Sequence, residues 1–67
     1  MERKMLIGRK LTMLMYDKKV DNSDLAAAIN ISEQSVSNLK NNKTIPKLNT
    51  AIAIAEYFGI TVEELTS

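Results

Sequence analysis

The sequence predicts an all-α domain built from five short helices, and three observations indicate this class. Apolar residues recur at spacings of three and four, as in Ile7, Leu11 and Leu14. Residues that favour helix starts or ends, such as Ser32 and Gly59, separate these stretches. No stretch shows the alternation of apolar and polar residues that is typical of a strand. At 67 residues, the chain is expected to form one domain over positions 1–67.

The first two helices are predicted over about residues 3–16 and 22–29, the second with clear boundary residues. Asp21 is the expected N-cap of the second helix, and Asp24 lies in its first turn, where a negative charge is favourable. Asn30 is expected to end this helix in the left-handed conformation, because Asn tolerates a positive φ better than most residues.

The third and fourth helices are predicted over about residues 33–41 and 48–58. Ser32 is a favourable N-cap for the third helix, and Pro46 predicts an extended segment after it. Gly59 directly follows the fourth helix, at the position where a left-handed Gly commonly ends a helix.

A capping box predicts one more helix near the end of the chain. The Thr61 side chain is expected to accept a hydrogen bond from the amide of Glu64, and the Glu64 side chain to return a bond to the backbone. Ile60 and Leu65 are expected to point into the core.

Residues 22–41 have the spacing of a helix-turn-helix motif. Its apolar positions are Leu25, Ile29, Ile31, Val36 and Leu39, with the small residue Ala26 beside the first of them. Two short helices that cross steeply need a small residue at the crossing and a left-handed residue in the turn. The pattern by itself predicts a fold, since these positions form a core whatever the protein does.

Composition argues against catalysis. The chain has no His and no Cys, so it lacks the commonest general base, the thiol nucleophile and the strongest zinc ligands. We therefore expect no enzyme, no metal site, no cofactor and no small-molecule ligand. Residues 1–10 mix five charged side chains with a short apolar run, which fits neither a signal peptide nor a membrane span. A cytoplasmic protein is the expectation.

Charge is unevenly distributed along the chain. The net charge is only +1, but residues 1–47 carry nine basic and five acidic side chains, whereas residues 48–67 carry three acidic ones and no basic one. A domain with one basic side can place that side against phosphates, although a surplus of four charges is a modest signal.

The chain resembles the Cro and phage-repressor (XRE-type) helix-turn-helix family over about residues 5–66. The resemblance is carried by Leu25-Ala26, Ile31-Ser32, Val36-Ser37, Asn41, Pro46, Leu48, Ile54-Ala55, Phe58-Gly59-Ile60-Thr61 and Glu64-Leu65. It implies a compact five-helix, lambda-repressor-like domain that binds double-stranded operator DNA, usually as a homodimer. It further implies a transcriptional regulator, with repression of phage or bacterial promoters as the expected role.

The resemblance also implies which residues contact DNA. Base edges in the major groove are expected to meet Glu33, Gln34, Ser37 and Asn38, and phosphates to meet Asn22, Lys40, Asn41 and Lys43. Gln34 is the strongest single candidate, because a Gln amide can pair bidentately with adenine. Glu33 can accept from cytosine N4 but otherwise repels phosphate, so we expect it to contribute to specificity more than to affinity.

Three departures from the family pattern bear on this expectation. Asn30 and Asn42 stand where the family usually has Gly, and Asn tolerates the same backbone conformation. Many members pair an Arg in the first helix with a Glu in the third, and the matching residues here are Met15 and Lys40. We expect an apolar contact there, with the stem of Lys40 over Met15.

Two further hypotheses concern protein partners. Ile54, Tyr57, Val62 and Leu65 exceed the apolar residues that the last two helices need for their buried face, which predicts a homodimer interface there. The alternative function is a protein–protein adaptor or antitoxin-like module with weak or no DNA binding. The low net charge, Glu33 in the third helix and the missing Arg favour that alternative, whereas the hydrogen-bonding side chains of the helix favour DNA.

Overall fold

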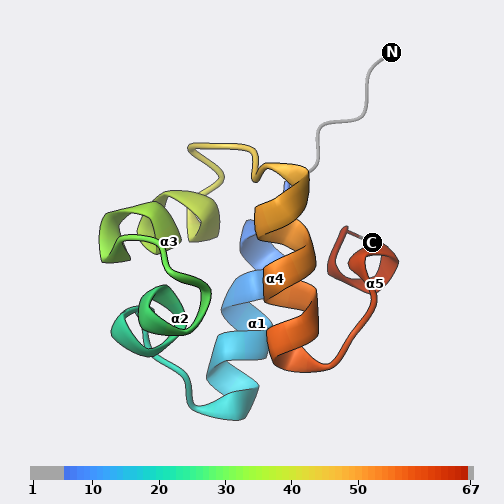
Figure 1. The fold of residues 1–67 in the computed structure, drawn as a ribbon, viewed down its shortest axis with the longest axis horizontal. Helices are drawn as coiled ribbons and strands as arrows, with labels where there is room; N and C mark the ends of the chain where they lie inside the picture. The colour runs from blue at the N-terminus through green and yellow to red at the C-terminus, as the bar shows by residue number, and fades with distance from the viewer. Residues whose placement is uncertain (1–5, 67) are drawn as a thin grey trace.

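Five helices enclose one core in the computed structural model, which describes residues 6–66. They are α1 (Gly8–Lys18), α2 (Asn22–Ile29), α3 (Glu33–Lys40), α4 (Leu48–Phe58) and α5 (Val62–Thr66). The helices pack as a closed ring, in which α1 contacts α3 and α5, α4 contacts α2 and α5, and α2 contacts α3. The pair α2 and α3 lies on one side of the domain and α5 on the opposite side (Figure 1). The predicted all-α class is therefore confirmed.

The helix boundaries agree closely with the sequence prediction except at α1. The bounds of α2 and α4 are as predicted, and α3 ends one residue early, at Lys40. The prediction of about 3–16 for the first helix was wrong within the described residues, because α1 begins at Gly8 and runs to Lys18. Ile7 is the N-cap, and Lys19 ends the helix in the left-handed conformation (φ 55°). The predicted positions 3–5 lie outside the described residues.

The predicted caps explain why the helices stop and start where they do. Asp21 and Asp24 form a capping box, with the amide of Asp24 donating to Asp21 Oδ1 over 2.8 Å. Ser32 Oγ accepts from the amide of Ser35 at 3.0 Å, and Thr61 Oγ1 accepts from the amide of Glu64 at 3.0 Å. These bonds satisfy amides that have no partner inside their own helix.

The core is apolar throughout the described residues, and every helix contributes to it. Its buried members are Ile7, Leu11, Met15, Leu25, Ala26, Val36, Leu39, Ala51, Ile54, Ala55, Phe58 and Leu65. Ala26 is 5% exposed on α2, where its small side chain allows α3 to approach closely. No helix in the described range is both long and apolar enough to cross a bilayer.

Candidate nucleic-acid interface

The turn between α2 and α3 holds the two helices in a fixed relation. Asn30 ends α2 in the left-handed conformation (φ 61°), as predicted, and the amide of Ile31 donates to the carbonyl of Ala26 over 3.0 Å. Ser32 then caps α3, so the two helices are separated by only three residues. This short, doubly capped connection presents α3 as a rigid element on the α2 side of the domain.

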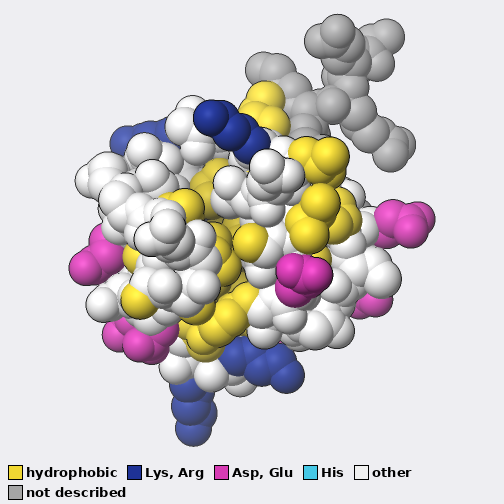
Figure 2. Space-filling model, viewed as in Figure 1, with side chains coloured by type: hydrophobic (Ala, Val, Ile, Leu, Met, Phe, Trp, Pro, Cys, Tyr) yellow, Lys and Arg dark blue, Asp and Glu magenta, His cyan; other side chains and the backbone are white. Residues whose placement is uncertain are grey.

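One face of α3 is buried and the other is open to solvent. Val36 and Leu39 are 0% and 4% exposed, which fixes the rotation of the helix about its axis. Glu33 and Gln34 are consequently exposed, and Ser37 lies half-buried at the side of the helix. The surface over α3 is mostly white in Figure 2, the colour of uncharged polar side chains and of the backbone. Such a surface offers hydrogen bonds without a strong charge.

Gln34 and Asn38 form a pair of amides on the open face. Gln34 Nε2 donates to Asn38 Oδ1 at 3.0 Å, one helical turn apart. A Gln amide has two N–H donors and one acceptor oxygen, so this bond uses one donor and leaves Gln34 with one donor and its acceptor. These are the two groups that bidentate pairing with adenine requires. The internal bond also restricts the side-chain rotamers of both residues before any ligand is present.

Two of the predicted phosphate-contacting residues are joined across the motif. Lys40 Nζ, near the end of α3, donates to Asn22 Oδ1, at the start of α2, over 3.0 Å. An ammonium group has three N–H donors, so this bond leaves Lys40 able to donate to an anion as well. The structure thus gathers a positive charge and an amide at one point between α2 and α3. The contact expected between the Lys40 stem and Met15 stays a prediction.

The remaining two predicted phosphate contacts differ in their local bonding. Asn41 Nδ2 donates to the backbone carbonyl of Ser37 at 2.9 Å and lies 3.4 Å from its Oγ, so the Asn41 side chain folds back onto α3. Lys43 is exposed and follows directly after the turn that ends α3. Lys43 is therefore placed as an accessible cation, whereas Asn41 already uses one N–H within α3 and has at most one left to donate to phosphate.

Sequence reasoning missed two features close to this surface. A hollow of about 310 Å³ lies beside Asn38, and its lining includes Lys47 and Thr50 from the start of α4. This places a third Lys near α3, after Lys40 and Lys43. The sequence showed Lys47 as a basic residue but not its place beside Asn38. Gly8, which the sequence marks only as a weak helix former, packs against the end of α3.

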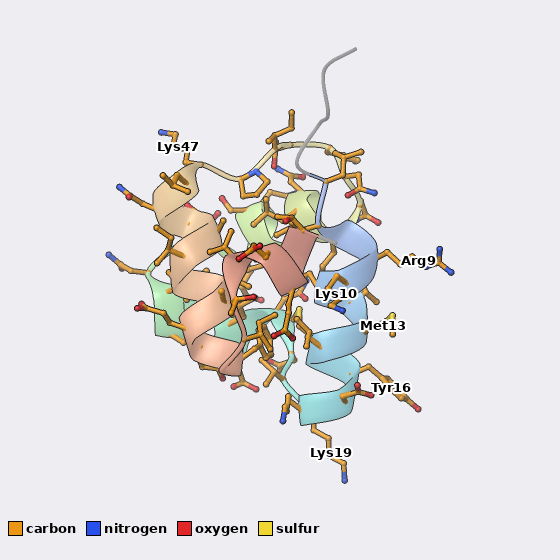
Figure 3. All side chains as sticks on the ribbon, turned by 90° about the vertical axis from the view of Figure 1, so that its right-hand side faces the viewer. Arg9, Lys10, Met13, Tyr16, Lys19 and Lys47 are labelled. Atoms are coloured by element: carbon orange, nitrogen blue, oxygen red, sulfur yellow. The ribbon has the colours of Figure 1, made fainter. Side chains whose placement is uncertain are left out.

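The four residues predicted to form a homodimer interface have different exposures. Ile54 and Leu65 are each 0% exposed, so both fill the core of a single chain and leave no surface for a second copy. Val62 is half-buried, and Tyr57 is 42% exposed. Larger apolar exposure lies on α1, where Tyr16 is 85% exposed and points away from the domain, as Figure 3 shows.

Comparison with known proteins agrees with this geometry. The family model described as the Cro/C1-type HTH DNA-binding domain matches residues 10–67, which include all five helices apart from the first two residues of α1. No curated protein matches the chain. The match covers the capped turn, α3 and the residues predicted to contact bases and phosphates.

Proposed function

The chain belongs to the Cro/C1-type helix-turn-helix family, and we propose that it regulates transcription by binding a specific operator with α3 in the major groove of duplex DNA. The observation that carries this proposal is the Gln34–Asn38 amide pair on the open face of α3. Amide side chains at the exposed face of such a helix can distinguish base pairs by their donors and acceptors, which a merely solvated surface does not require.

The charged groups around α3 support the same orientation. Lys40 is the last residue of α3 and donates to Asn22 at the start of α2, Lys43 follows the helix, and Lys47 directly precedes α4. Cations that flank a groove-contacting helix can neutralise the phosphates on either side of the groove and set the register of the protein. We infer that Lys40 and Lys43 supply most of the affinity, and that Gln34 and Asn38 supply most of the discrimination.

We propose repression as the regulatory outcome and a homodimer as the binding form. A protein bound in the major groove of a promoter excludes other proteins from the same surface. Two copies related by a twofold axis would contact two half-sites about one helical turn apart, which makes the operator palindromic. Because Ile54 and Leu65 are buried, any dimer contact along α4 and α5 must use other residues of these helices that are exposed, such as Tyr57.

Replacement of Gln34 is expected to change base preference more than affinity. In a selection from a random duplex pool, the wild type should enrich a short, twofold-symmetric sequence, and Gln34→Ala should relax one position in each half because its amide no longer pairs with a base. Lys43→Ala is the matched control, since loss of a phosphate contact weakens all sequences evenly and leaves the motif unchanged. An unchanged motif for Gln34→Ala would remove this residue from the base-contacting set.

Salt dependence separates DNA binding from the adaptor alternative. If each of two subunits places Lys40 and Lys43 on phosphates, four contacts give a slope of about −3.6 in log K against log salt, or about a hundredfold loss of affinity between about 50 and 200 mM. The measurement is a fluorescence-anisotropy titration of the selected duplex at several salt concentrations. No duplex binding above background at low salt would instead favour the adaptor, and a pull-down would then seek its protein partner.

A further inference from the structure

The start of α1 has no cap of its own. Its N-cap residue is Ile7, whose side chain has no oxygen and makes no capping hydrogen bond. The first amides of a helix have no partner within that helix, and they are usually satisfied by a nearby Ser, Thr, Asp or Asn side chain. Here the amide of Gly8 donates to Oδ1 of Asn42, which is 34 residues away in sequence, at 2.9 Å. Asn42 therefore caps α1 from outside the helix.

The backbone of Asn42 also ends α3. Its φ is 57°, and the turn around it carries the two hydrogen bonds of a Schellman motif. The amide of Asn42 donates to the carbonyl of Leu39 at 3.3 Å, and that of Lys43 to the carbonyl of Asn38 at 2.9 Å. Gly would serve the backbone equally well but offers no side-chain acceptor, whereas Asn combines a left-handed backbone with a short acceptor.

Gly8 is the other half of this contact. A Cβ atom on Gly8 would lie 2.6 Å from Asn42 Oδ1 and would also clash with the backbone carbonyl of Lys40. The end of α3 can therefore approach the first turn of α1 only because Gly8 has no side chain. The contact ties the turn that carries Lys43 to a helix that is packed into the core through Leu11 and Met15, on the same face as Gly8.

We propose that Asn42 is a positioning residue for DNA binding, which holds Lys43 at the phosphate backbone by capping α1 with its side chain while its left-handed backbone ends α3. This inference rests on the proposed function, and it assigns to Asn42 a role that acts through Lys43 and not through direct contact with DNA. Fixing the turn at two points lowers the conformational freedom that Lys43 must lose on binding.

The test is a double-mutant cycle between Asn42→Gly and Lys43→Ala, measured as affinity for the selected duplex and as the slope of that affinity with salt. Asn42→Gly keeps the turn and removes only the side-chain acceptor. We expect it to weaken binding at about 0.15 M salt by up to about thirtyfold, and to lower the magnitude of the slope by up to about 1.8, the values for two phosphate contacts, one in each subunit of the proposed homodimer. Asn42→Gly in the Lys43→Ala background should cost nothing further.

Asn30→Gly is the matched control, because Asn30 has the same left-handed backbone (φ 61°) in the turn before α3. It should leave both affinity and salt slope unchanged. All variants are measured well below their melting temperatures, and a purely structural role of Asn42 would lower the melting temperature without changing the salt slope.

Two results of the binding measurements would overturn the inference while leaving the proposed function intact. One is a salt slope for Asn42→Gly equal to that of the wild type, and the other is additive losses in the double variant. If the wild type itself binds no duplex at low salt, the proposed function fails, and this inference with it. Exchange of the Gly8 amide with solvent, followed by NMR, should be faster in Asn42→Gly, and unchanged exchange would also overturn the capping role.

Discussion

Leu25→Ala is expected to remove a large part of the free energy of unfolding. Leu25 is 0% exposed in α2, the first helix of the helix-turn-helix motif, and truncation of a buried Leu to Ala typically costs about 2–5 kcal/mol. A chain of this length has a total free energy of unfolding of only about 3–10 kcal/mol. The expected loss is therefore a large part of the stability, and urea denaturation followed by far-UV circular dichroism measures it.

Leu48→Ala is the matched control for this prediction. It removes the same atoms from a side chain that is 61% exposed at the start of α4, so the free energy of unfolding should change by no more than about 0.5 kcal/mol. A loss of less than about 1 kcal/mol for Leu25→Ala would contradict the burial of this residue. Equal losses for the two variants would contradict the predicted difference between a core and a surface position.

Gly8→Ala is expected to destabilise the domain, although Ala is the better helix former by about 1 kcal/mol. The added methyl group would meet the Lys40 carbonyl and the Asn42 side chain, one of them a backbone atom that cannot move without shifting the end of α3. Overpacking of this kind typically costs about 1–3 kcal/mol. Thermal unfolding should show a lower melting temperature, by about 4–8 °C for each kcal/mol lost.

Asn49→Ala controls for helix propensity alone, because Asn49 is an exposed residue in the first turn of α4. This substitution should leave stability unchanged or raise it slightly. A melting temperature for Gly8→Ala at or above that of the wild type would show that the end of α3 does not press on α1. DNA affinity should fall for Gly8→Ala as well, since the same shift moves the turn that carries Lys43.

Local features of the fold were predictable because they depend on neighbours in sequence. The caps at Asp21 and Ser32 and the left-handed Asn30 each act over at most four residues, so the residue types alone indicated them. The residue at which α1 begins was harder to predict. Ile7 fits the apolar spacing of a helix but lies just before the first helical residue, since periodicity reports which side faces the core and not where hydrogen bonding begins.

The sequence predicted which residues belong to the candidate site but not the hydrogen bonds between them. Family resemblance indicated Gln34, Asn38 and Lys40 as DNA-contacting residues of the motif; the structure pairs Gln34 with Asn38 on α3 and places Lys40 beside Asn22 of α2. The bond from Lys40 to Asn22 joins two helices, so no pattern within either helix could indicate it. Ile54 and Leu65 were wrong as dimer contacts for a related reason, since apolar character did not reveal that both are fully enclosed, whereas Tyr57 and Val62 stay predictions.

The sequence by itself determined the five helices, the caps at Asp21, Ser32 and Thr61 and the family, because hydrogen bonds within a few residues and the spacing of apolar side chains are local properties. The tertiary structure alone decided that Gly8 must lack a side chain and that Asn42 caps α1. Those facts arise where two segments 34 residues apart come within hydrogen-bonding distance, and their approach depends on how all five helices share one core.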